Sequence, residues 1–141
     1  MSLTPFRINN KIILNLTQNS TSLTSGNGSL IVKGGMSITK DIFIGGTLQT
    51  ESDIRLKENL VDLSGCIDYI DDIRTVRYNY IKKPEETHIG FIANDFLQDF
   101  PEVVKTDENG YLSMDYSKLT PILLNCIKDL KARVISLEAR V

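Results

Sequence analysis

The sequence lacks tryptophan and contains two cysteines, one histidine and four prolines among its 141 residues. So few nitrogen and sulfur ligands exclude a four-ligand zinc site built from His and Cys alone. No apolar run approaches the ~18 residues that a membrane-spanning helix needs, and the chain does not open on a signal-peptide pattern. The net charge of −2 provides no broad basic surface for nucleic acid. We therefore expect no metal, no cofactor, no membrane and no nucleic-acid partner.

The composition that is present changes close to residue 51. Residues 1–50 carry a charge of +3 and are rich in Ser, Thr, Asn and Gly, whereas residues 51–141 carry −5 and nearly all of the charged side chains. Hydrophobic residues at 41% and charged residues at 24% are ordinary for globular proteins, so wholesale disorder is not expected. The change predicts two segments, 1–51 and 52–141.

The first segment is predicted to be rich in short strands. Apolar and β-branched runs bounded by turn residues predict strands at 11–16 and 29–33. Two runs that end in a double glycine, 30–35 and 42–46, resemble each other and predict either two ordinary hairpin turns or a strand–turn repeat. About fifty residues with few large side chains cannot bury a core alone. We therefore favour an intertwined β stalk, similar to a triple β-helix, that stacks against copies from other chains.

The second segment is predicted to mix helices and strands. Alternation over 76–80 predicts a half-buried strand that returns through Ile89 and Phe91 after a polar turn. Asn109-Gly110 predicts a hairpin between 103–104 and 111–112. A short helix ends at Pro101, and an earlier helical face recurs at three- and four-residue steps through Leu60, Leu63, Ile67, Ile70 and Ile73. The expected fold class is therefore α+β.

The last helix begins near Ser117 or at Thr120 as N-cap, with Pro121 in the first helical position, and covers about 120–141. Its apolar residues alternate steps of four and three, which is typical of a coiled-coil seam. The seam residues are Leu123, Ile127, Leu130, Val134, Leu137 and Val141. Arg133 would reach Glu138 of a neighbouring copy. The alternative is one amphipathic helix folded onto its own domain; the seam favours self-association, and its branched a positions with Leu at d lean toward a dimer.

A serine and a lysine lie five residues apart at the segment boundary, in Ser52-Asp53-Ile54-Arg55-Leu56-Lys57. A serine hydroxyl needs a nearby base to become a nucleophile, and a desolvated lysine amine can serve as that base. Taken alone, the pair is better explained by an N-cap serine followed by a surface lysine. A serine–histidine pair through His88 is a further candidate, although a histidine beside Ile89 in a strand is more often structural.

Several ordered motifs identify a family that the chain resembles. They are Ser52-Asp53-Ile54-Arg55-Leu56-Lys57-Glu58-Asn59-Leu60, Gly90-Phe91-Ile92-Ala93-Asn94-Asp95, Phe100-Pro101-Glu102-Val103-Val104 and Gly110-Tyr111-Leu112-Ser113-Met114-Asp115-Tyr116-Ser117-Lys118-Leu119. Together with the helix that follows, they resemble the intramolecular chaperone auto-processing domain. That domain ends phage endosialidase tail spikes and many tail fibres, and it also occurs in the myelin regulatory factor. The resemblance covers residues 52–141.

The resemblance implies a homotrimer whose chaperone domain folds the preceding fibre segment, its client, and then releases itself. Carried over to matching positions, Ser52 is the nucleophile, Lys57 is the general base and Asp53 has a supporting role. The cut lies beside Ser52, either at the Glu51–Ser52 bond or at the Ser52–Asp53 bond. The enzyme would be a serine endopeptidase that acts once, on its own chain.

The resemblance also implies a place of action, the virion of a phage, with assembly in the host cytoplasm. Cys66 and Cys126 lie on apolar helical faces and are expected to be buried, reduced thiols.

The main alternative to a self-cleaving chaperone is a structural trimerisation or adhesion module of a viral fibre that keeps the fold and never cuts. A DNA-binding role, as in the myelin regulatory factor, lacks a basic recognition segment.

Overall fold

The computed structural model describes residues 28–140, and the chain divides into two units between Glu51 and Ser52. Each unit is described by itself. The strand predicted at 11–16 and the last seam residue, Val141, lie outside the described residues. Among residues 28–140, no helix combines the length and the apolar character that crossing a bilayer requires.

Residues 28–51 form no helix and no strand. The strands predicted at 29–33 and 42–46 are therefore not formed within one chain, because a strand needs a neighbour that accepts and donates its backbone hydrogen bonds. The apolar side chains of this stretch are exposed, with Phe43 at 95% and Leu48 at 77%. A β stalk built from several chains stays a prediction.

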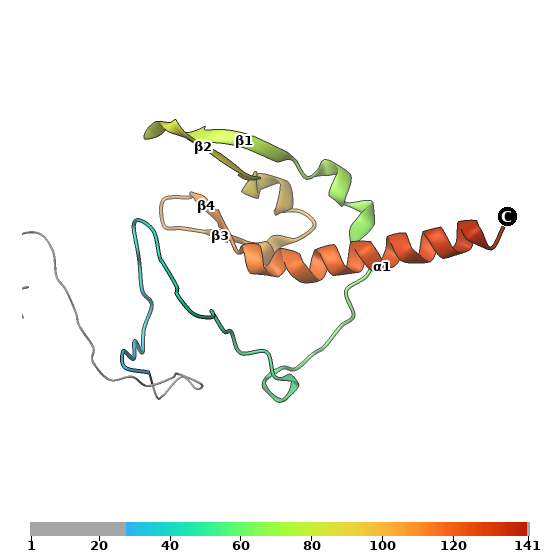
Figure 1. Ribbon diagram of the computed structural model, residues 1–141, viewed down its shortest axis with the longest axis horizontal. Coiled ribbons are helices and arrows are strands. Elements are labelled where there is room, and N and C mark those ends of the chain that lie inside the picture. The colour runs from blue at the N-terminus through green and yellow to red at the C-terminus, as the bar shows by residue number, and fades with distance from the viewer. Residues whose placement is uncertain (1–27, 141) are drawn as a thin grey trace, which may run out of the picture. The chain divides into compact units, whose positions relative to one another are not determined.

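The second unit is a small α+β domain that contains two antiparallel hairpins (Figure 1). Strand β1, Thr75–Tyr80, pairs with β2, Lys83–Phe91, and strand β3, Val104–Thr106, pairs with β4, Leu112–Met114. The predicted strand at 76–80, its return and the Asn-Gly hairpin are confirmed. Much of the turn predicted at 82–86 belongs to β2, because the register shifts between Asn79 and Tyr80 and the pairing continues to Lys83.

Asp107 shapes the turn between β3 and β4. Its carboxylate accepts the backbone N–H groups of Asn109 at 2.9 Å and Tyr111 at 2.8 Å. Gly110 has a φ of +83°, which a residue with a side chain adopts rarely. The Asn-Gly pair therefore works here by supplying the left-handed residue that the turn needs.

The long helix α1, Leu119–Glu138, starts one turn after the Asp115 carboxylate. This carboxylate accepts the backbone N–H of Ser117 at 3.1 Å and its hydroxyl at 2.6 Å, which caps the 3₁₀ turn η6, Tyr116–Lys118. The predicted N-cap at Thr120 is therefore wrong, because the chain is already helical at Leu119. Pro121 lies third in the helix, where its backbone nitrogen has no partner within the helix.

The continuous helical face predicted from Leu60 to Ile73 is replaced by two 3₁₀ turns, η2, Cys66–Asp68, and η3, Ile70–Asp72. Gly65 has a φ of +68° and ends the extended run before η2. Similarly, the helix predicted around Phe96 to Phe100 is the 3₁₀ turn η4, Ala93–Phe96, and Pro101 begins another turn, η5, Pro101–Val103.

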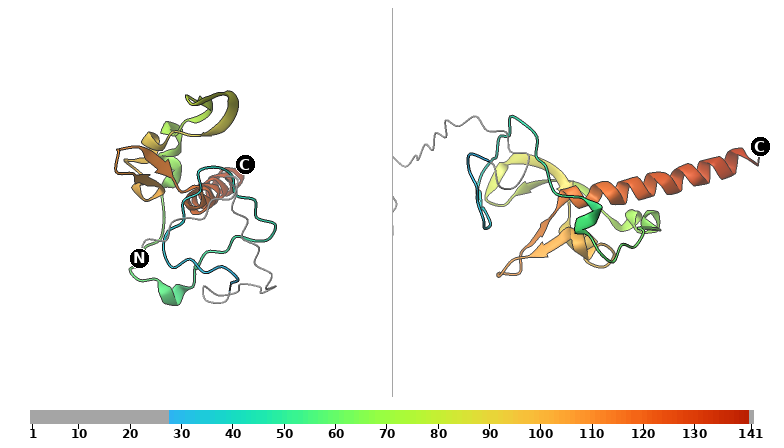
Figure 2. Two further views of the ribbon diagram at one scale, coloured as in Figure 1. Left: turned by 90° about the vertical axis from the view of Figure 1, so that its left-hand side faces the viewer. Right: turned by 90° about the horizontal axis from the view of Figure 1, so that it is seen from below.

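The hydrophobic core lies where the first half of α1 meets these turns. The ribbon views show the turns beside the helix (Figures 1 and 2). Phe91 and Phe96 meet edge to face with their ring centres 5.6 Å apart. The buried hydrophobic residues of the core are Cys66, Phe96, Phe100, Val103, Leu119, Ile122 and Cys126. Both thiols are free and buried, as predicted, and burial raises the pKa of each.

We predict that Gly90→Ala destabilises the domain. Gly90 is buried in β2, and an added Cβ would lie 2.7 Å from the Tyr116 hydroxyl oxygen and 3.4 Å from Tyr78 Cε1. Shifting the Tyr116 ring should lower the free energy of unfolding by about 1 kcal/mol, measured by urea denaturation. Tyr116→Phe removes the clashing atom, so the double variant should recover part of the loss. Equal losses in the single and double variants would contradict this reason.

A second prediction concerns the ion pair between Arg74 and Asp95, whose closest atoms are 2.6 Å apart. The hydrogen bonds from Arg74 hold the pKa of Asp95 below its usual range. A lowered pKa in the folded state means that the stabilisation is present at neutral pH and is lost as acid protonates the carboxylate. Asp95→Asn should therefore lower the urea midpoint at pH 7, and this difference from wild type should shrink below about pH 4. A difference that is unchanged in acid would contradict the assignment.

Candidate functional site

Ser52 and Lys57 contact one another across a single 3₁₀ turn, η1, Ile54–Leu56. The turn is closed by backbone hydrogen bonds from Leu56 N–H to the Asp53 carbonyl and from Lys57 N–H to the Ile54 carbonyl, each 3.1 Å. It returns the chain so that the Lys57 Nζ donates to the Ser52 Oγ over 2.8 Å. The spacing of five residues is thus the spacing that one tight turn requires.

The turn forms because Asp53 caps it. The Asp53 backbone is extended, and its carboxylate accepts the backbone N–H of Arg55 at 2.8 Å. The same carboxylate accepts the Arg55 side chain from Nε at 3.0 Å and from Nη2 at 2.7 Å. The Arg55 side chain, followed by its backbone N–H, lowers the pKa of Asp53, and the carboxylate in turn raises the pKa of Arg55.

The turn is fully open to solvent in the single chain. Every residue from 51 to 60 is exposed. A lysine amine accepts a proton only in its neutral form, and burial is the environment that favours that form. One chain therefore supplies the contact between hydroxyl and amine, whereas the enclosure that nucleophilic catalysis needs has to come from elsewhere.

The structure brings together two of the four residues predicted at the cut. Ser52 and Lys57 are in contact, while Asp53 turns to Arg55 and not to the hydroxyl. Glu51 precedes the turn and is exposed. Arg55 was not identified from the sequence. The signal that could have identified it is an acidic and a basic residue two positions apart, Asp53 and Arg55, between the serine and the lysine.

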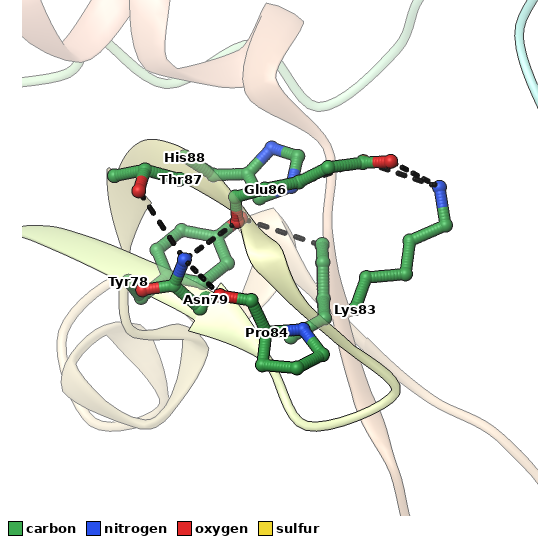
Figure 3. A network of polar contacts seen from close by, with 8 residues as sticks. Tyr78, Asn79, Lys83, Pro84, Glu86, Thr87 and His88 are labelled. Atoms are coloured by element: carbon green, nitrogen blue, oxygen red, sulfur yellow. Dashed lines mark hydrogen bonds and ion pairs between the residues drawn. The ribbon is translucent and has the colours of Figure 1, made fainter.

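His88 belongs to a separate polar network at the β1–β2 hairpin (Figure 3). Its ring stacks on Tyr78 with centres 5.5 Å apart, and its Nε2 lies 3.8 Å from the Glu86 carboxylate and forms no hydrogen bond. Nearby, the Asn79 amide donates to the Pro84 and Glu86 carbonyls, at 3.0 and 2.8 Å. The predicted alternative of a Ser52–His88 pair is therefore not formed, and His88 is a structural residue of the hairpin.

A groove of about 700 Å³ lies between the two hairpins. Its walls include Tyr78, Tyr80, Tyr111 and Tyr116, together with Asn94 and Ser113. The hydrogen bond between the Tyr78 and Tyr80 hydroxyls raises the pKa of Tyr78 to about 12. With hydroxyls and an amide but no base beside a nucleophile, the groove offers no catalytic pair. Within residues 28–140, no group of His, Cys, Asp and Glu is arranged to hold a metal ion.

Helix α1 presents two different stripes. Leu119, Ile122 and Cys126 are buried against the domain, whereas the predicted seam residues Leu123, Ile127, Leu130, Val134 and Leu137 are each 50–62% exposed. The helix therefore packs on its own domain through a stripe beside the seam, and its second half projects past the hairpins (Figures 1 and 2). Arg133 forms an ion pair with Asp68 of its own chain at 3.3 Å. Its charge is therefore already paired without the predicted contact to Glu138 of a neighbouring copy.

Comparison with known proteins supplies the family context of the turn. The family described as "Chaperone of endosialidase" matches residues 52–105, beginning at the candidate nucleophile. The long tail fibre proteins Gp37 of Enterobacteria phages K3 and T2 are each 31% identical over 98 residues, which is 64% of this chain. The aligned part is 8% and 7% of their lengths, so the chain spans less than a tenth of these relatives. The match confirms the resemblance carried by the motifs at 52–60, 90–95 and 100–104.

Proposed function

We propose that residues 52–141, whose segment 52–105 belongs to the chaperone of endosialidase family, form an intramolecular chaperone of a phage tail fibre that cuts its own chain beside Ser52. The observation that carries the proposal is the 2.8 Å contact between Lys57 Nζ and Ser52 Oγ at the first residues of the family match. The client is the segment that precedes Ser52, and the place of action is the virion after assembly in the host.

The proposed cut follows from the reach of the hydroxyl. Lys57 takes the proton of the Ser52 hydroxyl, Oγ attacks the Glu51 carbonyl carbon, and the Glu51–Ser52 C–N bond breaks as the Ser52 nitrogen takes up the proton. Water then hydrolyses the resulting ester. Attack on the preceding carbonyl passes through a five-membered ring, whereas attack on the carbonyl of Ser52 itself would need a strained four-membered ring. We therefore favour Glu51–Ser52 over Ser52–Asp53.

Assembly would supply the enclosure that one chain lacks. The exposed seam of α1 is an unpaired apolar stripe, and its heptad spacing suits a coiled coil with other copies. The heptad residues alone favour two copies. We propose three because the family resemblance implies a trimer. Burial of the 52–57 turn between copies would favour the neutral amine of Lys57 and exclude water from the nucleophile.

The order of events has a thermodynamic reason. Residues 28–51 contain no secondary structure in one chain, so a common register between chains has a high entropic cost. Association through α1 raises the local concentration of the attached segments and reduces that cost. Cleavage then removes the element that nucleated assembly, and the fibre segment is left kinetically stable.

The first test is the mass of the purified full chain after incubation. Wild type should release a fragment that begins at Ser52. Ser52→Ala should abolish cleavage, and Lys57→Ala should slow it by about 100-fold or more, because general base catalysis contributes at least that much. Lys82→Ala, at an exposed lysine in the β1–β2 turn, serves as the matched control and should cleave normally.

Uncut wild type in stable oligomers would contradict the self-cleaving activity and would favour the structural trimerisation or adhesion module. A cut that persists in Ser52→Ala would assign the cleavage to a contaminating protease. A fragment that begins at Asp53 would move the scissile bond by one residue while keeping the nucleophile.

The second test separates the two stripes of α1. Val134 lies in the seam and is 50% exposed, whereas its neighbour Ile135 lies off the seam and is 55% exposed. Val134→Asp should convert trimers to monomers in analytical ultracentrifugation, because it buries a charge in the seam. Ile135→Asp should leave the trimer intact. Trimers in both variants, or wild-type monomers, would contradict the proposed seam.

A further inference from the structure

We propose that Arg55 is a positioning residue that keeps the Asp53 carboxylate away from Lys57, so that the amine is free to act on Ser52. The inference rests on the proposed function, because it concerns the residue that controls the charge near the proposed base, Lys57. It also explains why a carboxylate is tolerated next to the nucleophile of a serine–lysine pair.

Among residues 28–140, the donors that reach the Asp53 carboxylate all belong to Arg55. Three N–H groups of Arg55, the backbone N–H, Nε and Nη2, reach the carboxylate at 2.8, 3.0 and 2.7 Å. Both carboxylate oxygens are used, with Oδ1 on the backbone and Nε and with Oδ2 on Nη2. A guanidinium matches a carboxylate in this two-point manner, which a lysine cannot do.

The competing contact is close at hand. The positive charge of Lys57 already acts on the Asp53 carboxylate, since it contributes to lowering the pKa of Asp53. A carboxylate released from Arg55 would attract the Lys57 ammonium, stabilise its charged form and compete with the Ser52 hydroxyl for its N–H donors. Each of these effects would hinder Lys57 in taking the proton of the Ser52 hydroxyl.

The other charges near the turn are few. Glu51 and Glu58 flank Ser52 and Lys57 in the sequence, and across the described part of the chain Lys57 takes part in no ion pair with either. Within the 52–57 turn, the other charged groups are Asp53, on which the charge of Lys57 acts, and Arg55, which pairs with Asp53. Removing one member of this pair leaves the other uncompensated, with opposite signs for the two deletions.

The test is the pH dependence of the cleavage rate in the full chain. Arg55→Ala removes the two side-chain donors to the carboxylate and leaves the backbone N–H on Oδ1. The carboxylate loses its guanidinium partner, so the midpoint of the profile should move upward by about half a pH unit, which lowers the rate about threefold below the midpoint. Asp53→Asn keeps an oxygen for the Arg55 backbone N–H but frees the guanidinium, so its midpoint should move downward. The double variant should return toward wild type.

A purely structural role of the pair would lower the rate at every pH and leave the midpoint in place, and that result would overturn the proposal. Arg55→Lys should restore the midpoint more than the rate, because it keeps the charge and loses the two-point geometry. Lys82→Ala controls for a general loss of surface charge.

A measurement that needs no cleavage separates this proposal from the proposed function. In the uncut full chain carrying Ser52→Ala, the ¹³C NMR titration of Lys57 Cε, assigned through Lys57→Arg, should also move upward when Arg55→Ala is added. A shift there with no cleavage in wild type would support the role of Arg55 and contradict the self-cleaving activity. No shift would overturn the role of Arg55 even if wild type cleaves.

Discussion

The burial of one stripe of α1 is the interaction on which the described domain depends. Leu119, Ile122 and Cys126 form one hydrophobic cluster with buried side chains from the surrounding 3₁₀ turns. The contact is reinforced by Asn125, whose amide oxygen accepts the Cys66 backbone N–H at 3.2 Å and whose nitrogen donates to the Leu63 carbonyl at 2.9 Å. Because the chain buries this stripe itself, the adjacent predicted seam stays exposed.

The same division separates folding from assembly. The first half of α1 completes the core of a single chain, whereas the side chains from Leu130 onward are exposed over the rest of the described helix. A small core of seven buried side chains is enough to present the seam but leaves the turn at Ser52 in solvent. Folding alone therefore prepares the hydroxyl and the amine without enclosing them, which is the arrangement that a reaction timed by association requires.

Local signals in the sequence predicted local structure well. Alternation predicted β1 and β2, and Asn109-Gly110 predicted the β3–β4 turn. The pairing of Ser52 with Lys57 was expected from the family resemblance and not from their five-residue spacing, and one tight turn brings the two side chains into contact. The helix predicted from Leu60 onward is absent because Gly65 adopts a positive φ. On either side of it, the Leu63 carbonyl and the Cys66 N–H bond to Asn125 of α1, about sixty residues away, which the local period does not reveal. Arg55 escaped notice because its role is to occupy Asp53, which becomes visible only in three dimensions.

The exposed apolar residues of 28–51 have a consequence during translation. Phe43, Leu48 and their neighbours leave the ribosome before the domain that follows them, so each nascent chain exposes an apolar stretch while residues 52–141 are still being synthesised. Ribosomes spaced closely on one messenger RNA would bring the α1 helices of neighbouring nascent chains close together as they emerge.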